Sequence, residues 1–138
     1  MNERRERDVA AGDKLPDVGD CFNRACPTRA VLSHVTGRWG SLVIAALRSA
    51  GVLRFSELRA RIGGISEKML AQTLRELERD GLIVRTSKRV VPPHVDYRLS
   101  ALGAGVAEHV EGLVRWIETH ARELICAQRE HDADGAFR

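Results

Sequence analysis

Apolar positions repeat at helical spacing from about residue 27 onward. A first helix is expected to begin at Pro27, because proline suits a first helical position, and to break near Gly37. A second apolar face, Trp39–Ala50, predicts another helix that ends at Gly51 in the way typical of helix C-termini. The pattern therefore predicts two helices in direct succession.

Two further helices are predicted next, and a pair of glycines separates them. A short extended piece at Leu53–Phe55 precedes a brief helix that Ser56 caps and Gly63-Gly64 closes. Ser66 then caps the following helix, because its hydroxyl can accept hydrogen bonds from free backbone N–H groups of the first turn. This helix reaches Asp80, and its apolar stripe consists of Leu70, Leu74 and Leu77.

The period of the pattern changes after this helix. Segments 82–88 and 94–99 predict two strands around a Pro92-Pro93 turn, which together make a hairpin. A last helix is predicted over about residues 100–127, longer than a domain of this size needs. Because the upstream helices already have apolar faces to match, its stripe predicts a seam with a second copy of the chain. The stripe consists of Leu102, Val106, Val110, Leu113, Ile117, Ala121 and Leu124.

Together these elements predict a mainly α fold with a small β wing. Two short helices joined by a glycine turn and followed by a hairpin have the order of a winged helix-turn-helix, here with a C-terminal dimerisation helix. A single domain is expected over residues 21–127, including the dimerisation helix of about 100–127. The charged, aperiodic residues 1–20 and 128–138 are expected to be mobile tails.

In such a fold the second helix of the pair lies in the major groove, and its outward face has suitable chemistry. Lys68, Gln72 and Arg75 stand opposite the leucine stripe. Glutamine can bond adenine bidentately, and lysine or arginine reaches guanine or phosphate. The alternative is a merely solvated helix face, which the position between a glycine turn and a basic hairpin disfavours. The candidate DNA-contacting residues are Ser66, Lys68, Met69, Gln72, Thr73, Arg75 and Arg79 on this helix, and Arg85, Lys88 and Arg89 on the wing.

Composition narrows the function further. The 138 residues are 43% hydrophobic and 30% charged, with a formal net charge of +3. The positive charge is concentrated in segment 52–99, which suits a polyanionic partner, although an ordinary solvated surface could carry the same charge. Only 4% of the residues are aromatic, which disfavours binding of single strands by base stacking.

Catalysis, metal binding and export are not expected. The chain has no Gly-rich phosphate loop, no Ser/His/Asp set and no paired catalytic carboxylates at usable spacing, and its five histidines are scattered. We therefore expect neither enzymatic activity nor a metal or cofactor. The N-terminal MNERRERDVAAGDK lacks the apolar centre of a secretory signal, and no segment is apolar enough to span a membrane. A cytoplasmic protein with three free cysteines is expected.

Three stretches of the chain carry a family resemblance: CPTRAVLSHVTGRWGSLVIAAL, RFSELRARIGGISEKMLAQTLRELERDGLIVR and VPPHVDYRLSALG. They resemble the HxlR-type regulators, a branch of the MarR-like winged-helix superfamily, over roughly residues 26 to 127. The resemblance implies a homodimeric transcriptional regulator, in the first place a repressor, that binds inverted-repeat operators in double-stranded DNA. It also implies that the N- and C-terminal helices form the dimer interface and that Ser66–Thr73 lie on the DNA-reading helix.

The resemblance also implies a switch, because many relatives sense oxidants or electrophiles through the cysteine before the first helix, here Cys26. A thiol at a helix start lies in a positive field, to which Arg24 and Arg29 add, and this field favours the thiolate. Cys21 could then resolve a sulfenate on Cys26. In the alternative interpretation Cys26 is a small buried hydrophobic residue that packs the first helix. Cys126 is expected to face away from the seam and to have no role in the switch.

Two other functions stay open at this point. The regulator could be switched by a small apolar ligand between the dimerisation helices and the winged domain, in a cavity lined by Trp39, Trp116 and Phe55. Alternatively, the winged helix could bind protein or RNA. A protein- or RNA-binding module would not need the basic, outward-facing helix that carries Lys68 and Arg75.

Overall fold

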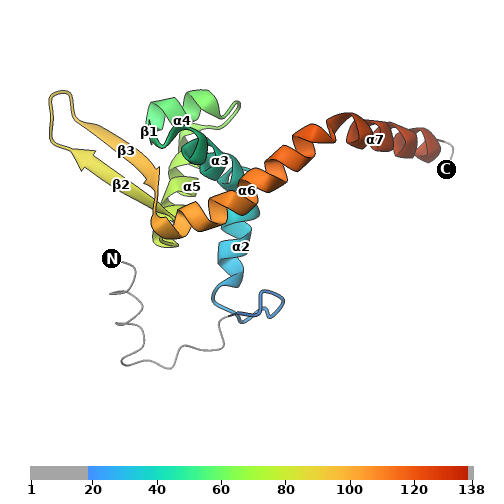
Figure 1. The fold of residues 1–138 in the computed structure, drawn as a ribbon, viewed down its shortest axis with the longest axis horizontal. Coiled ribbons are helices and arrows are strands. Elements are labelled where there is room, and N and C mark those ends of the chain that lie inside the picture. The colour runs from blue at the N-terminus through green and yellow to red at the C-terminus, as the bar shows by residue number, and fades with distance from the viewer. Residues whose placement is uncertain (1–18, 137–138) are drawn as a thin grey trace.

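The computed structural model describes residues 19–136, which form helices around a small antiparallel sheet (Figure 1). This arrangement confirms the predicted mainly α fold with a β wing. The elements are α2 (Arg29–Thr36), α3 (Gly40–Ala50), β1 (Val52–Arg54), α4 (Phe55–Arg61), α5 (Glu67–Arg79), β2 (Ile83–Lys88), β3 (His94–Leu99), α6 (Ala101–Thr119) and α7 (Ala121–Gly135).

The sheet has the strand order β1-β3-β2, with both pairs antiparallel. The hairpin of β2 and β3 pairs from Ile83 opposite Leu99 to Lys88 opposite His94, as its sequence pattern predicts. Strand β1 joins β3 on the other side, where Leu53 lies opposite Tyr97 and both side chains are buried. Strand β1 thus anchors the base of the hairpin to the helical body, while the tip of the hairpin projects from that body (Figure 1).

Helix α3 lies at the centre of the core. Its residues Val43, Ile44 and Leu47 are almost completely buried and pack with leucines from α4 and α5. Burial of a large aliphatic side chain contributes roughly 1.5–3 kcal/mol, so this cluster is the main source of stability. The leucines that complete it are Leu58, Leu70, Leu74 and Leu77.

Helix α6 crosses this core with a face of small residues. Gly103 and Ala107 are buried there, and Val110 is buried beside them. The approach is closest at Gly103, where a β-carbon would lie only 1.8 Å from the carbonyl oxygen of Leu82. Only glycine permits this contact between the start of α6 and the residue before β2.

One predicted helix is two in the structure. The expected single helix over about 100–127 breaks at His120, and α7 then continues to Gly135, through residues expected to be an aperiodic tail. The cause of the break is local: the Thr119 hydroxyl donates to the Arg115 carbonyl (2.7 Å), and a His120 ring nitrogen lies 2.8 Å from the Trp116 carbonyl. Such side-chain bonds to backbone carbonyls one turn earlier bend helices.

Two predicted helix starts also differ from the structure. Helix α2 begins at Arg29, after a turn that contains Pro27. Helix α4 begins at Phe55 rather than after Ser56, because the Glu57 carboxylate accepts from the backbone N–H of Arg54 (3.0 Å) and fixes the first turn two residues earlier. Most of the predicted N-terminal tail, residues 1–18, lies outside the described residues.

None of the helices in the described range is by itself long and apolar enough to cross a membrane. Helices α2 and α3 together have the length and composition, but they are bent by 68° relative to each other.

Candidate nucleic-acid interface

Helix α5 is held as a rigid unit after the glycine turn. Gly64 has a φ of 84°, a left-handed conformation that glycine adopts without strain. This conformation directs the chain into the start of α5. The Ser66 hydroxyl accepts from the backbone N–H of Met69 (3.1 Å), which confirms the predicted N-cap. Ile65 before the cap and Leu70 after it are both buried, so the helix entry is fixed on its apolar side as well.

The side of α5 opposite the core is a continuous polar face. Lys68, Gln72, Arg75 and Arg79 are all exposed there. The Gln72 side chain donates to the Glu76 carboxylate at 3.2 Å, a contact between neighbouring turns of the helix. Met69 lies at the edge of this face and is partly exposed. The helix therefore presents hydrogen-bond donors and positive charge on one side, as the sequence predicts.

Thr73 does not belong to that face. The prediction that its side chain lies on the outward side of α5, where DNA could be contacted, is wrong. Its side chain is only 6% exposed, and its hydroxyl donates to the Met69 carbonyl (2.8 Å). The reason is helical geometry, because Thr73 lies three residues after Leu70 and four before Leu77 and so shares their inward stripe.

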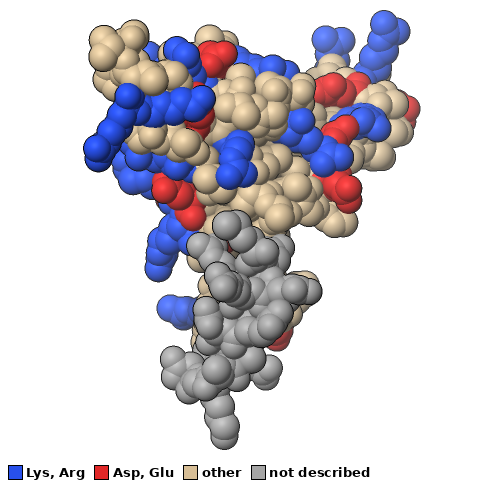
Figure 2. Space-filling model, turned by 60° about the vertical axis from the view of Figure 1, so that its left-hand side comes forward, with Lys and Arg blue, Asp and Glu red and all other residues tan. Residues whose placement is uncertain are grey.

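The wing carries further basic residues next to the reading helix in sequence. Arg85, Lys88 and Arg89 are exposed, but the Lys88 ammonium lies 3.2 Å from the Asp96 carboxylate on the neighbouring strand. Among the described residues Arg85 and Arg89 make no ion pair. Figure 2 shows basic side chains on both sides of the face in view, with acidic side chains scattered among them.

The tip of the wing has a feature that the sequence analysis missed. Val90 is half-exposed and Val91 is fully exposed, so the tip between the basic residues and the two prolines is apolar. The run of two valines before Pro92 was the available signal, because an apolar pair at a hairpin tip cannot be buried by the hairpin itself.

The predicted dimer seam divides into two groups in the structure. Val106 and Val110 pack against the protein's own core, whereas Leu102, Leu113 and Ile117 are exposed. Ala121 and Leu124 fall on α7, where Leu124 is partly buried. The structure adds Trp116 to the exposed group. We call Leu102, Leu113, Trp116 and Ile117 the outer apolar face of α6.

The three cysteines lie in different surroundings. Cys21 and Cys126 are exposed, whereas Cys26 is only 6% exposed and lies outside the main core cluster. The Cys26 Sγ is 3.1 Å from the Thr28 hydroxyl. Hydrogen bonds from the Thr28 hydroxyl first, and then from the Thr28 backbone N–H, hold the pKa of the Cys26 thiol below its usual value. Its burial is what a structural cysteine would show, and its lowered pKa favours a reactive one.

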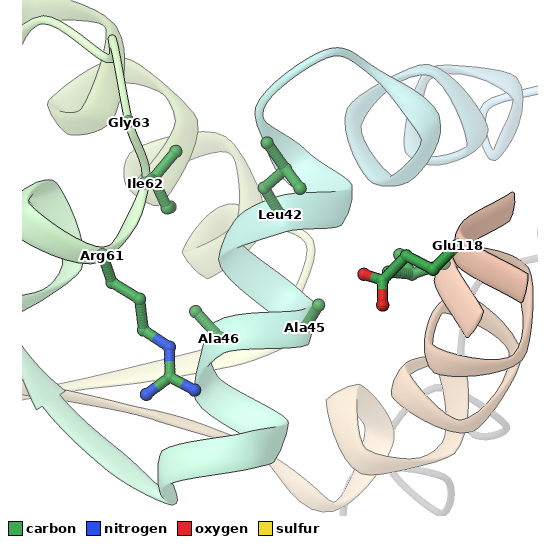
Figure 3. Close-up of a pocket in the computed structure, with 8 residues that line it drawn as sticks. Leu42, Ala45, Ala46, Arg61, Ile62, Gly63 and Glu118 are labelled. Carbon is green, nitrogen blue, oxygen red and sulfur yellow. The ribbon is translucent and has the colours of Figure 1, made fainter. Parts of the chain in front are cut away.

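A pocket of about 370 Å³ lies between α3, the end of α4 and α6 (Figure 3). In Figure 3 Arg61 and Glu118 flank it from opposite sides, with Ala45 and Ala46 of α3 between them. The expected aromatic lining is not present, since none of Trp39, Trp116 and Phe55 borders this pocket. Its lining residues are Leu42, Ala45, Ala46, Arg61, Ile62, Gly63, Val114 and Glu118.

The three aromatic residues are instead dispersed. Trp39 and Phe55 pack against the core cluster, and Trp116 stacks on His120 with ring centroids 4.5 Å apart. These surroundings in the described residues therefore give no support to a single ligand cavity lined by all three.

Comparisons with known proteins agree with this architecture. Residues 34–124 match the HxlR-like helix-turn-helix family. The chain is 51% identical over 115 residues to the uncharacterized HTH-type transcriptional regulator YtfH of Escherichia coli, covering 83% of this chain and 90% of that protein. The transcriptional regulator ytfH from Salmonella typhimurium has a TM-score of 0.75 at 53% identity, over 81% of this chain and 98% of that one. The redox regulator HypR in its oxidized form has a TM-score of 0.62 at 33% identity, over 68% and 96%.

A capped, outward-facing helix after a glycine turn, followed by a basic hairpin, defines a winged helix-turn-helix transcriptional regulator, a class of DNA-binding proteins. The family follows from the match over most of the chain and from the close relatives. The chain belongs to the HxlR-like helix-turn-helix family, as its three stretches of sequence predict.

Proposed function

We propose that this regulator is a homodimer that represses transcription by binding an inverted-repeat operator. The observation that carries the proposal is the polar face of α5, with Lys68, Gln72 and Arg75 exposed on a helix whose other side is fixed in the core. Such a helix can enter the major groove without rearrangement and bond to base edges. The wing then lies over the adjacent backbone, with Arg85 and Arg89 directed to phosphates.

The homodimer follows from the exposed apolar surface. Leu113, Trp116 and Ile117 are each about half exposed on α6, and Ile125 on α7 and Leu32 on α2 are exposed as well. A two-fold axis through this surface would bury the same residues twice. It would place two α5 helices on half-sites about one helical turn of DNA apart.

Base contacts and phosphate contacts should respond differently to mutation. We expect Gln72→Ala to weaken the operator complex by about 1–3 kcal/mol while leaving scrambled DNA nearly unaffected, because a bidentate base contact is lost. Arg89→Ala should weaken both complexes similarly and flatten the dependence of affinity on salt. Fluorescence anisotropy with both duplexes at several salt concentrations measures these effects.

Lys88→Ala is the matched control on the wing. Because its ammonium is already paired with Asp96, it should weaken DNA binding less than Arg89→Ala. A wild-type protein that shows no preference for the promoter next to its own gene over scrambled DNA would contradict the proposed function and favour a protein- or RNA-binding module.

Cys26 is the proposed switch. The hydrogen bonds from Thr28 stabilise its thiolate, the form that oxidants and electrophiles attack. The thiol is nearly buried just before α2, so a modified sulfur would no longer fit between the turns of residues 20–28 and would displace the start of that helix. Exposed Cys21 is the proposed partner that resolves a sulfenate on Cys26 by forming a disulfide and releasing water.

Treatment with a quinone or with diamide should lower the operator affinity of the wild type on the order of tenfold, equivalent to about 1.4 kcal/mol, and should leave Cys26→Ser unchanged. Since the pKa of Cys26 is lowered, its alkylation rate should rise with pH through a midpoint below that of an ordinary cysteine thiol. The alkylation is measured in a Cys21→Ser, Cys126→Ser background. An equal response of wild type and Cys26→Ser would exclude Cys26.

A further inference from the structure

The turn Asp80–Leu82 joins the reading helix to the wing. Asp80 is the C-cap of α5, and β2 begins at Ile83. Gly81 has a φ of 79°, and the backbone N–H of Leu82 donates to the Leu77 carbonyl at 3.0 Å. The turn is therefore tightly closed, and whatever holds it also orients the end of α5.

Side chains from both helices that flank the winged unit hold this turn. From α2, His34 Nδ1 donates to the Asp80 carboxylate at 2.6 Å. From the start of α6, the Ser100 hydroxyl donates to the Gly81 carbonyl at 2.6 Å, and the Ser100 backbone N–H donates to the Leu82 carbonyl at 3.0 Å. Two elements far apart in sequence thus meet at one end of the reading helix.

The contact from α2 is specific and partly shielded. The side chain of His34 is 20% exposed and that of Asp80 only 9%, so water competes weakly for this hydrogen bond. Among the described residues it is the side-chain hydrogen bond that joins α2 to α5. Its charge assistance makes it stronger than a neutral bond of the same geometry.

The bond fixes the C-terminal end of α5, and with the fixed N-terminal end it sets the angle of the helix. Lys68 lies twelve residues before Asp80, which corresponds to about 18 Å along the helix axis. If the N-terminal end of α5 stays fixed, a displacement of Asp80 by about 1 Å tilts the helix by roughly 3°. A change of helix angle alters the geometry of hydrogen bonds to base edges, on which sequence readout depends, whereas phosphate contacts carry no sequence information.

We propose that His34 is a positioning residue for operator recognition, which holds α5 at the angle that base contacts require through its bond to Asp80. This inference rests on the proposed DNA-binding function. His34 itself touches no DNA. It sets the register of the reading helix against α2, the helix that begins just after Cys26.

Operator and scrambled duplexes should be compared for His34→Ala, His34→Asn and Thr36→Ala. We expect His34→Ala to weaken operator binding on the order of tenfold and to leave scrambled DNA within twofold. His34→Asn should restore most of the preference, because its amide N–H occupies the place of Nδ1. Thr36→Ala is the control on α2, since its hydroxyl bonds only within the helix, to the Leu32 carbonyl.

A double-mutant cycle with Asp80→Asn completes the test. If the two residues act together, His34→Ala should add little to the loss of preference in the Asp80→Asn background. Equal losses on both duplexes with a lowered Tm would show a merely structural role and overturn the proposal. So would an unchanged preference in His34→Ala. A wild type without operator preference would instead contradict the proposed function.

Discussion

Gly103→Ala is expected to lower the free energy of unfolding by about 3 kcal/mol, and Gly103→Val by more. A β-carbon at this position would lie 1.8 Å from the Leu82 carbonyl oxygen and 2.8 Å from its carbonyl carbon. These are backbone atoms, and Leu82 is held in turn by its hydrogen bonds to Leu77 and Ser100. Helix α6 would therefore have to move off the core to make room.

Thermal unfolding followed by circular dichroism measures this effect. For a chain of this size about 3 kcal/mol corresponds to a fall in Tm on the order of 10 °C. Gly105→Ala is the matched control two residues further along α6, because no atom lies within 4 Å of its β-carbon position. It should raise stability by up to about 1 kcal/mol, since glycine is unfavourable inside a helix. Similar losses in both variants would show that the close approach at Gly103 is not the cause.

The second large effect is expected at the outer apolar face. Leu113→Glu places a charge where the proposed interface buries apolar surface, and we expect it to give a monomer in analytical ultracentrifugation. Operator affinity should fall by about 10²- to 10⁴-fold, because binding of the second half-site is no longer intramolecular. Helical stability should change little, since Leu113 is half exposed in the single chain.

Ala104→Glu is the control for this variant. Ala104 is exposed on the opposite side of the same helix, so the same charge there should leave the oligomeric state unchanged. A Leu113→Glu protein that sediments as a dimer and binds the operator with wild-type affinity would place the interface elsewhere.

Local patterns were sufficient to predict the reading helix and the wing. The Ser66 cap and the leucine stripe depend on residues within three or four positions of one another, and so does the alternation of β2 and β3. The prediction for Thr73 in the same helix is wrong because a polar side chain can lie on the inward stripe when its hydroxyl has a partner. Its hydroxyl is satisfied by the Met69 carbonyl one turn earlier, which allows it to be buried.

Contacts between distant segments could not be predicted in the same way. The bond between His34 and Asp80 joins positions 46 residues apart, and β1 pairs with a strand more than 40 residues later. Neither leaves a periodic signal. On α6 the large apolar side chains predict only part of the buried surface, because the helix contacts the core through small residues such as Gly103 and Ala107.

The outer apolar face has a further consequence for how such a regulator behaves in a cell. In the proposed homodimer, a protomer that leaves this face uncovered would be less stable than the assembled pair, so folding would be linked to association by mass action. Dilution would then both unfold the protein and remove it from the operator. The abundance of the regulator would then become a control variable of its own.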